Sequence, residues 1–342
     1  MNDQPVYVGL DYHQSGIQVS VVDAGGRELL NRRCENDAAA VVRIVRGMGR
    51  VRRAALESCC GAADLAEELV QGHDWSVHLA HPGFVRRMKM NPDKTDLGDA
   101  RLLADLTRVG YLPRVWLPPA AVREIRLLVR HRQQLADERR AAKLRIRAVL
   151  REQRVRPAPE TGRPWSRPWV AWLREGAAGL SEQGRWIVEQ HLLTIDHVHA
   201  RIAAAEARLE AFTRDDPTVR RLRAERGIGP VTAWWLRAEI GRFDRFDRGK
   251  QLSRFCGVSP RNVSSGERQA EAGLVKAGNP RLRAILIEAG HRLIMHDPRW
   301  RAFAGRLRRR GKPGSVIAAA VANRWLRWLH HRMQEEVTPA AA

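Results

Sequence analysis

The sequence predicts an α/β domain followed by an all-α region, and three observations support this. In the first part of the chain, short β-branched apolar runs alternate with segments of helical periodicity. Two long, charged segments with helical periodicity follow, separated by a stretch rich in proline and tryptophan. The rest consists of helical patterns interrupted by glycine and proline. We expect three domains, at residues 1–112, 113–215 and 216–342.

The first domain begins with three predicted strands. Val6–Leu10 and residues 17–23 are apolar runs, and Gly25 and Gly26 form a predicted hairpin turn into a third strand over Glu28–Cys34. Three antiparallel strands followed by strand–helix units are the order expected of a ribonuclease-H-like fold. The later elements are predicted as strands at 53–56 and 76–79 and as helices at 37–48, 61–71 and 95–108.

Four carboxylates lie at the ends of these elements. Asp11 follows the first strand, and Glu57 ends a second apolar stretch. Asp96 and Asp99 open a helix, and their spacing of three residues puts them on one helix face. Clustered carboxylate oxygens suit hard cations, and two such ions can assist in-line displacement at a phosphodiester. The pattern therefore predicts a Mg²⁺ (or Mn²⁺) site that cuts nucleic acid.

A purely structural interpretation of these acidic residues stays open. Asp96 is an alternative helix N-cap and Asp99 a first-turn charge that complements the helix dipole. Asp93 and Asp105 are nearby alternative ligands. Asp11 is harder to explain structurally, because a carboxylate that directly follows a buried run is costly unless something pairs with it.

The composition predicts a polyanionic partner. The chain has 342 residues, with 60 Lys and Arg against 38 Asp and Glu, a net charge of +22. A GC-rich genome would explain Arg over Lys but not this net charge, and Arg grips phosphate bidentately. The sequence shows no apolar run of about 20 residues and no basic signal-peptide start, so we expect a cytoplasmic, nucleoid-associated protein without membrane contact. The cysteines lack zinc-like spacing, and we expect Cys59 and Cys60 to be reduced core residues.

The middle of the chain predicts a helical hairpin. Residues 120–154 form one highly charged helical segment with an imperfect apolar stripe, and a second helix runs over about 181–212. Such a coiled-coil-like hairpin packs on itself or on another subunit. A plain structural spacer and an RNA-grasping arm are both open interpretations.

The last domain contains a predicted helix–hairpin–helix in LRAERGIGPVTAWWLRAEIG. Gly227 and Gly229 flank the turn and Pro230 opens the next helix, so that free N–H groups at the helix start can hold a phosphate. An ordinary Gly-Pro connection between helices is the alternative.

The basic tail NRWLRWLHHR carries two tryptophans three residues apart. Trp325 and Trp328 either stack on bases or form a stripe that faces the core, and the sequence does not decide between these. His296, His330 and His331 have no convincing metal spacing.

Two sets of motifs, in this order along nearly the whole chain, resemble one family. The first set comprises GLD at 9–11, the glutamate of ALES at 57 and KTDLGDA at 94–100. The second comprises GIGPVTA at 227–233, FCGVSPRNVSSGER at 255–268 and KAGNPRLRAILIEA at 276–289. The chain resembles the DEDD transposases of bacterial insertion sequences, the insertion-sequence-110 family, which includes pilin-gene invertases. One departure is that a Gly-Tyr pair expected soon after the glutamate is replaced by CCGA at 59–62.

The resemblance implies an insertion-sequence transposase that acts as an RNA-guided DNA recombinase. Its RuvC-like domain would hold Mg²⁺ on the four carboxylates, and a serine in a mostly helical transposase domain would attack the DNA. A noncoding bridge RNA encoded by the element would pair with donor and target double-stranded DNA. The protein would work as a homo-oligomer, a dimer or tetramer.

The family pattern places the nucleophile just before a glycine and five residues after a proline, which picks out Ser265, with Ser264 as the competing hydroxyl. Arg261 and Arg268 flank it and could neutralise a scissile phosphate. No local His or Asp forms a triad, so activation must come from elsewhere, with the tetrad's metal as the natural candidate. A covalent 5′-phosphoserine would keep the bond energy for rejoining. The residues expected to bind nucleic acid are Arg261, Arg268, Gly227, Gly229, Lys276 and Arg281.

Two other functions remain in view. A RuvC-like hydrolytic nuclease, such as a Holliday-junction resolvase, would use only the carboxylates and would leave the C-terminal third without a role. A non-catalytic basic scaffold would bind nucleic acid but leave the order of the carboxylates to chance.

Overall fold

The structure is a computed structural model that describes residues 4–89, 95–262, 271–275 and 278–334. The chain divides into two compact units, Met1–Pro119 and Ala120–Ala342. Each unit is described by itself.

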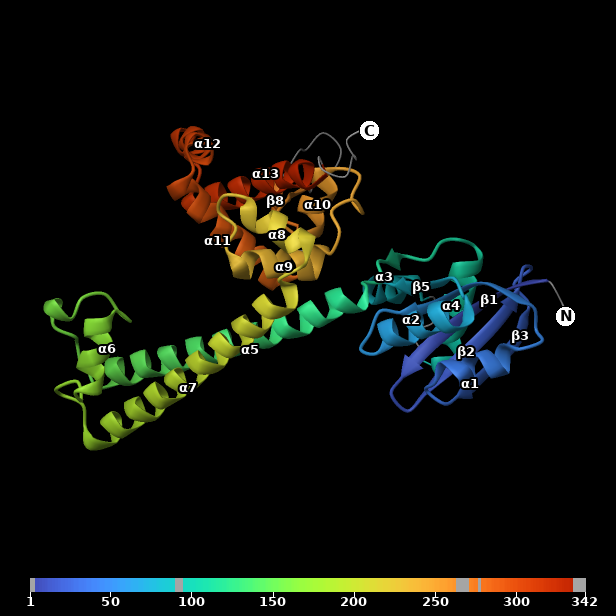
Figure 1. Cartoon of the computed structure of the whole chain (residues 1–342), viewed down its shortest axis with the longest axis horizontal. Coiled ribbons are helices and arrows are strands. Elements are labelled where there is room, and N and C mark those ends of the chain that lie inside the picture. Colours follow the sequence, from blue (N-terminus) through green and yellow to red (C-terminus); the bar gives the residue numbers. More distant parts are fainter. Residues whose placement is uncertain (1–3, 90–94, 263–270, 276–277, 335–342) are drawn as a thin grey trace. The chain divides into compact units, whose positions relative to one another are not determined.

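The first unit contains a six-stranded mixed sheet in the order β3-β2-β1-β4-β5-β6 (Figure 1). The first three strands pair antiparallel, β4 and β5 join β1 in parallel, and β6 is antiparallel at the edge. The predicted three antiparallel strands are thus confirmed. The strands are β1 Pro5–His13, β2 Gly16–Asp23, β3 Glu28–Cys34, β4 Arg50–Glu57, β5 Val77–Ala80 and β6 Arg114–Val115.

Helices cover both faces of this sheet. Alternate residues of β1, such as Val8 and Leu10, pack in one core with α1 (Ala38–Val45) and α2 (Ala62–His73). Ala55 and Ala80 face the other way and pack against Leu103 and Leu106 of α4 (Asp96–Arg108). α3 (Pro82–Met88), which the sequence pattern did not predict, adds Val85 to this second core. The two faces of the sheet are therefore occupied by different helices.

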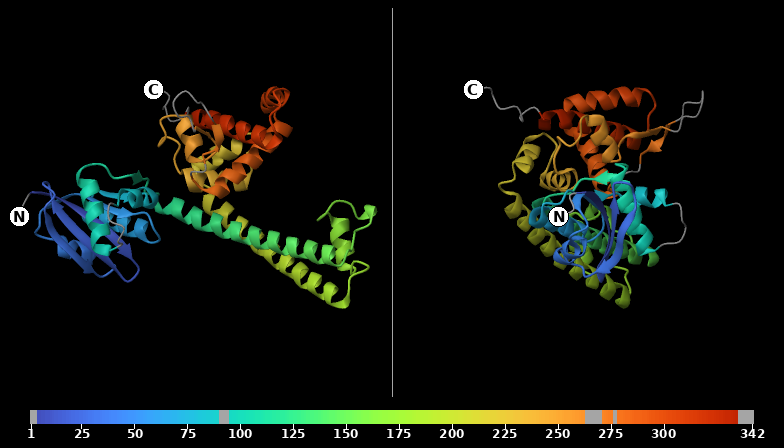
Figure 2. Two further views of the ribbon diagram at one scale, coloured as in Figure 1. Left: turned by 180° about the vertical axis from the view of Figure 1, so that it is seen from behind. Right: turned by 90° about the vertical axis from the view of Figure 1, so that its right-hand side faces the viewer.

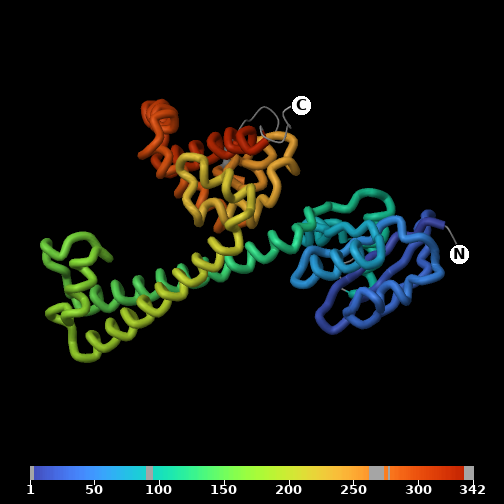
Figure 3. Tube along the Cα trace, in the orientation of Figure 1, coloured from blue at the N-terminus to red at the C-terminus, as the bar shows by residue number. Residues whose placement is uncertain are grey.

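The second unit begins with the predicted helical hairpin. α5 (Ala120–Glu152) and α7 (Glu182–Thr213) lie side by side along much of their length (Figure 3). Ser181 caps α7 by accepting a hydrogen bond from the Gly184 amide. In the sequence, a short 3₁₀ turn at Pro159–Thr161 and α6 (Arg167–Arg174) follow α5 and precede α7. Trp169 of α6 packs in one core with residues from the C-terminal end of α5 and the N-terminal end of α7.

The rest of the second unit is a helical domain with one small two-stranded ribbon (Figure 2). Its largest buried side chains include Trp235 and Trp325, which share one core with Ile125 of α5. The elements are α8 Pro217–Ala224, α9 Pro230–Ile240, α10 Gly249–Phe255, β7 Pro260–Asn262, β8 Glu271–Leu274, α11 Pro280–His296, α12 Pro298–Arg309 and α13 Gly314–Gln334.

The expectation that Cys59 and Cys60 are core residues is wrong. Both side chains are exposed, because they follow the last residue of β4 and form the turn into α2, beyond the packed part of the sheet. All four cysteines are free thiols. Within the described residues, no helix has the length and apolar character that crossing a membrane requires.

Candidate functional site

The sheet places Asp11 and Glu57 side by side, near the C-terminal ends of two parallel strands. β1 and β4 run parallel with Leu10 beside Leu56, so the next residue of each strand is one of these carboxylates. Because side chains alternate along a strand, Asp11 and Glu57 point to the face opposite to these buried leucines. That face is the one on which α4 packs.

α4 brings the second pair of carboxylates to this face. The Thr95 hydroxyl accepts a hydrogen bond from the Gly98 amide at 3.2 Å and is the N-cap of α4. The alternative that Asp96 is the N-cap is therefore wrong, and Asp96 is the first helical residue. Asp99 follows one turn later and is only 8% exposed.

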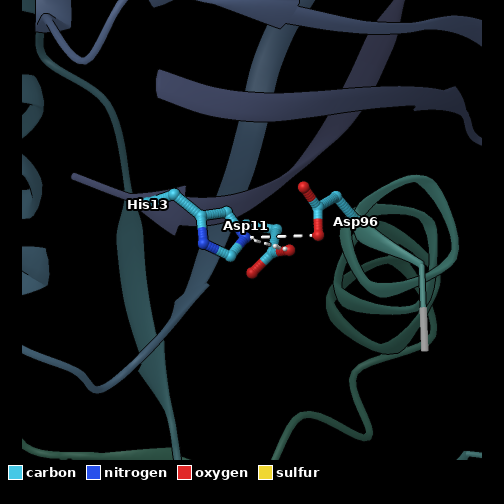
Figure 4. A group of neighbouring side chains, drawn as sticks. All are labelled: Asp11, His13 and Asp96. Atoms are coloured by element: carbon cyan, nitrogen blue, oxygen red, sulfur yellow. Dashed lines mark hydrogen bonds and ion pairs between the residues drawn. The ribbon is translucent and has the colours of Figure 1, made fainter. Parts of the chain in front are cut away.

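Asp11, His13 and Asp96 form a compact group (Figure 4). His13 Nε2 lies 3.1 Å from Asp11 Oδ2 and 3.4 Å from Asp96 Oδ1. One ligand atom from each of the three residues lies within 4.8 Å of the others. Two oxygens and one imidazole nitrogen at this separation are a donor set that one divalent cation can gather.

The electrostatics of the site show a crowding of negative charge. Burial raises the pKa of Asp11, and the charges of Asp99 and Asp96 raise it further, while the bond to His13 lowers it. The negative charges of Asp99 and Asp96 are each partly compensated by a basic side chain. Lys89 Nζ lies 2.5 Å from Asp99 Oδ1, and an Arg33 nitrogen lies 3.8 Å from Asp96 Oδ2. These cations reduce the same repulsion that a bound metal ion would reduce.

Glu57 and Asp99 lie outside this compact group of three. Glu57 is half-buried at the end of β4, and Asp99 is held by Lys89. Asp105, the alternative ligand, instead binds Arg101 at 2.8 Å and Arg108 at 3.2 Å on its own helix. Asp93 lies outside the described residues.

Sequence reasoning missed His13. The signal was present, since His13 follows Asp11 by two residues, which is the spacing that places two side chains on one face of a strand. The predicted strand ended at Leu10, whereas β1 continues to His13 through its pairing of Asp11 with Gln18 and of Tyr12 with Ile17.

The residues expected to act on DNA in the second unit are only partly described. Ser264, Ser265, Arg268 and Lys276 lie outside the described residues. Residues 263–270 join β7 to β8 in the sequence.

The base of this ribbon is anchored by buried polar groups. Ser259 is buried just before β7, and its hydroxyl lies 2.9 Å from that of Ser253. Asn323 of α13 donates to the Ser259 hydroxyl at 3.1 Å and to the Val258 carbonyl at 3.2 Å. These bonds fix the chain where it enters β7.

The two helices predicted on either side of the glycine turn are present as α8 and α9, whereas their function as a helix–hairpin–helix stays a prediction. Gly227 has φ of +87°, a conformation that favours glycine, and a side chain there would also press on the side chain of Leu293. Nothing in the surroundings requires glycine at 229. A cavity of about 530 Å³ borders this turn and includes Arg226 and Arg292.

Two further residues expected to bind nucleic acid have described positions. Arg261 is exposed on β7. Arg281, at the start of α11, is ion-paired with Asp137 of α5 at 2.5 Å.

Comparison with known proteins identifies the family. A model of IS110-type DEDD transposases, described as a transposase, matches residues 8–154, and a model described as "Transposase IS116/IS110/IS902 family" matches residues 219–305. The first range contains all four carboxylates of the predicted tetrad.

Three curated relatives agree. A "Probable family 20 transposase" of Pseudomonas aeruginosa is 30% identical over 82% of this chain and 84% of its own length. The transposase for insertion sequence element IS1111A of Coxiella burnetii is 25% identical over 96% and 90%. The transposase for insertion sequence element IS1328 of Yersinia enterocolitica is 28% identical over 80% and 81%. The chain therefore belongs to the IS116/IS110/IS902 family of insertion-sequence transposases.

Proposed function

We propose that this transposase cuts and rejoins DNA with a divalent-metal centre on a RuvC-like first unit and a serine nucleophile in the second. The observation that carries the proposal is the convergence of acidic residues at one edge of the sheet. Asp11 lies two residues before the end of β1, Glu57 ends the parallel strand β4 beside it, and Asp96 and Asp99 open the helix on the same face. A role as helix caps or turn residues does not explain why Asp11 and Asp96 lie in one group with His13.

The donors present suit Mg²⁺ (or Mn²⁺). Asp11, Glu57, Asp96 and Asp99 would hold the metal through hard carboxylate oxygens, with His13 beside them. When bound, the metal would polarise the scissile phosphate and activate the attacking hydroxyl. Until then, Lys89 and Arg33 neutralise part of the charge on Asp99 and Asp96.

Ser265 would carry out the attack on DNA. Its Oγ loses a proton and forms a bond to phosphorus, the bond from phosphorus to the 3′-oxygen breaks, and that oxygen takes up a proton. The product is a 5′-phosphoserine that keeps the phosphoester energy, so a 3′-hydroxyl can reverse the step without ATP. The basic side chains of Arg261 and Arg268 would hold the phosphate.

A noncoding bridge RNA that pairs with donor and target DNA would direct this chemistry, and the protein would act as a dimer or tetramer. The support is the net charge of +22 and the arginine-rich helix α5 of the hairpin. Leu127 and Leu144 of α5, and Trp186 and Leu193 of α7, are exposed apolar residues on this hairpin.

Strand cleavage and rejoining on a supercoiled plasmid with donor and target sites, in the presence of the element's RNA, tests the proposal. Wild type should recombine the sites with Mg²⁺ and not with EDTA. Asp11→Asn and Asp96→Asn should abolish both steps, whereas Asp105→Asn, on the same helix but paired with arginines, should recombine. Hydrolysis without rejoining would instead identify the resolvase-like nuclease, and metal-independent binding alone would identify the scaffold.

A further inference from the structure

The second unit contains an open cavity of about 970 Å³ between α12, α13 and the β7–β8 ribbon. This volume lies within the range of about 300–1,000 Å³ that small-molecule sites occupy. Val316 and Ala320 of α13 form part of its apolar wall, and Pro260 and Leu274 line it from the ribbon. The cavity is formed by segments that lie far apart in the sequence.

Two aromatic side chains line the cavity, and the guanidinium group of an arginine lies over each ring. Arg324 lies over the ring of Phe303 at 5.0 Å, and Arg299 lies over the ring of Trp328 at 5.4 Å. Both rings are only partly buried. Trp325, three residues before Trp328, is fully buried in the core. Trp325 therefore belongs to the core, whereas Trp328 packs against that core and also lines the cavity.

Among the described residues that line this cavity, the charged side chains are all basic. The ionisable residues among those that line it are Arg299, Arg324, Arg327 and His331, and none is acidic. Within the described residues, no carboxylate forms an ion pair with any of these three arginines. By contrast, Arg237 and Arg281 of the same unit are neutralised by aspartates. An aromatic, apolar cavity with unneutralised arginines at its rim is complementary to a flat base that carries a phosphate.

Both strands of the ribbon contribute to this cavity. Pro260 and Leu274 form a register pair of β7 and β8, and both line the cavity. The bonds from Asn323 to Ser259 and Val258 hold the base of the ribbon to α13, the helix that carries Trp328. Residues 263–270, which include Ser265, join the two strands.

We propose that this cavity takes one unstacked nucleotide of the DNA strand, with its base against Phe303 and Trp328 and its phosphate near Arg324 and Arg327. DNA is the chosen ligand because the described lining is aromatic and basic, and because β7 and β8 flank in the sequence the residues that include the serine proposed to attack DNA. The inference therefore rests on the proposed function. Removing a base from its stack is costly in duplex DNA, and a stacking surface on the protein offsets that cost. The cavity would thereby favour strands that are already distorted.

A binding experiment tests this without any cleavage. Fluorescence anisotropy in EDTA compares a labelled duplex that has one unpaired nucleotide with the same duplex carrying an abasic unit at that position. The phosphate charge is equal in both, so their affinity ratio reports contacts to the base. Wild type should bind the base-containing duplex roughly five- to 150-fold more tightly.

Variants locate the contact. Trp328→Leu and Phe303→Leu should each reduce this ratio toward one, and Trp328→Phe should retain most of it. Tyr111→Leu, at a position 70% exposed in the first unit, is the matched control and should leave the ratio unchanged. Arg327→Gln should weaken the binding of both duplexes alike. It should also reduce the dependence of log affinity on log salt concentration by about one phosphate contact. Thermal unfolding of each variant shows that it is folded.

The inference is overturned if wild type binds both duplexes equally, or if the folded Trp328→Leu and Phe303→Leu proteins keep the full ratio. It is also overturned if the ratio appears only with an RNA duplex of the same design. Because no metal or cleavage is involved, failure of the carboxylates as catalysts would leave this ratio intact, so the two proposals fail separately.

Discussion

Gly9 of β1 lies directly against the carbonyl oxygen of Ala100 in α4. A methyl group at Gly9 would collide with that oxygen and with the amide nitrogen of Ala104. The conformation of Gly9 does not require glycine, so the requirement comes from the close approach of the helix. This approach sets the distance between Asp11, two residues further along β1, and the carboxylates at the start of α4.

Gly9→Ala should therefore damage both stability and function. Overpacking of this kind costs about 1–3 kcal/mol, and the helix must move away from the strand that carries Asp11. Chemical denaturation of the purified protein should show the loss, and metal-dependent cleavage should fall sharply. Gly72→Ala is the control, because Gly72 lies in α2 with open space around it and should gain up to about 1 kcal/mol. Equal stability and equal cleavage rates of the two variants would contradict the role of Gly9.

Asp11→Asn should raise the melting temperature of the metal-free protein near neutral pH. The pKa of Asp11 is raised above 3.8 by burial and by its acidic neighbours, so its ionised form is disfavoured in the folded state. The stability linked to the protonated form is present below pH 3.8 and is lost as the pH rises through the folded pKa. The advantage of Asn should therefore shrink on acidification. It should also shrink with added Mg²⁺, which stabilises only the wild type. An unchanged melting temperature at every pH would contradict the crowding of charge.

His13→Ala should weaken the binding of Mg²⁺ without abolishing cleavage. His13 contacts both Asp11 and Asp96, and groups that support metal ligands typically contribute about ten- to 100-fold in affinity. The concentration of Mg²⁺ that gives half-maximal cleavage should rise accordingly. His73→Ala, at the exposed end of α2, should leave it unchanged. A wild-type Mg²⁺ dependence in His13→Ala would remove His13 from the site.

Ser265→Ala should bind DNA and RNA normally, yet form no covalent adduct and no recombinant. A suicide DNA substrate, with the attached peptide mapped by mass spectrometry, measures this directly. Ser264→Ala should keep at least part of both activities. An adduct on Ser264 would move the nucleophile by one residue, whereas recombination by Ser265→Ala without any adduct would return the chemistry to the carboxylates alone.

Sequence patterns predicted those parts of the fold that depend on local periodicity. The strand at Glu28–Cys34, the helix after Thr95 and both long helices lie within a few residues of their expected positions. The two-residue strand β6 is too short to carry an alternating pattern, and its pairing with β5 comes from tertiary contacts alone.

For the site too, the sequence revealed the residues that local periodicity marks and hid those that tertiary contacts position. Asp11 and Asp96 were visible because each lies at the boundary of a periodic segment. The extension of β1 to His13 was hidden, since a polar strand end resembles a turn until its pairing with β2 is known. The cavity beside Phe303 and Trp328 was hidden too, because the two rings are brought together by the packing of α12 on α13.

The most direct test of the central claim is to locate the metal. Crystals of the protein with uncleaved DNA, grown with Mn²⁺ and measured for anomalous scattering, would show where the ion binds. We expect a peak bordered by Asp11 and Asp96, with Glu57 and Asp99 close by, and no such peak in Asp11→Asn. A bound Mn²⁺ elsewhere in a protein that cleaves DNA, with this edge of the sheet empty, would contradict the account.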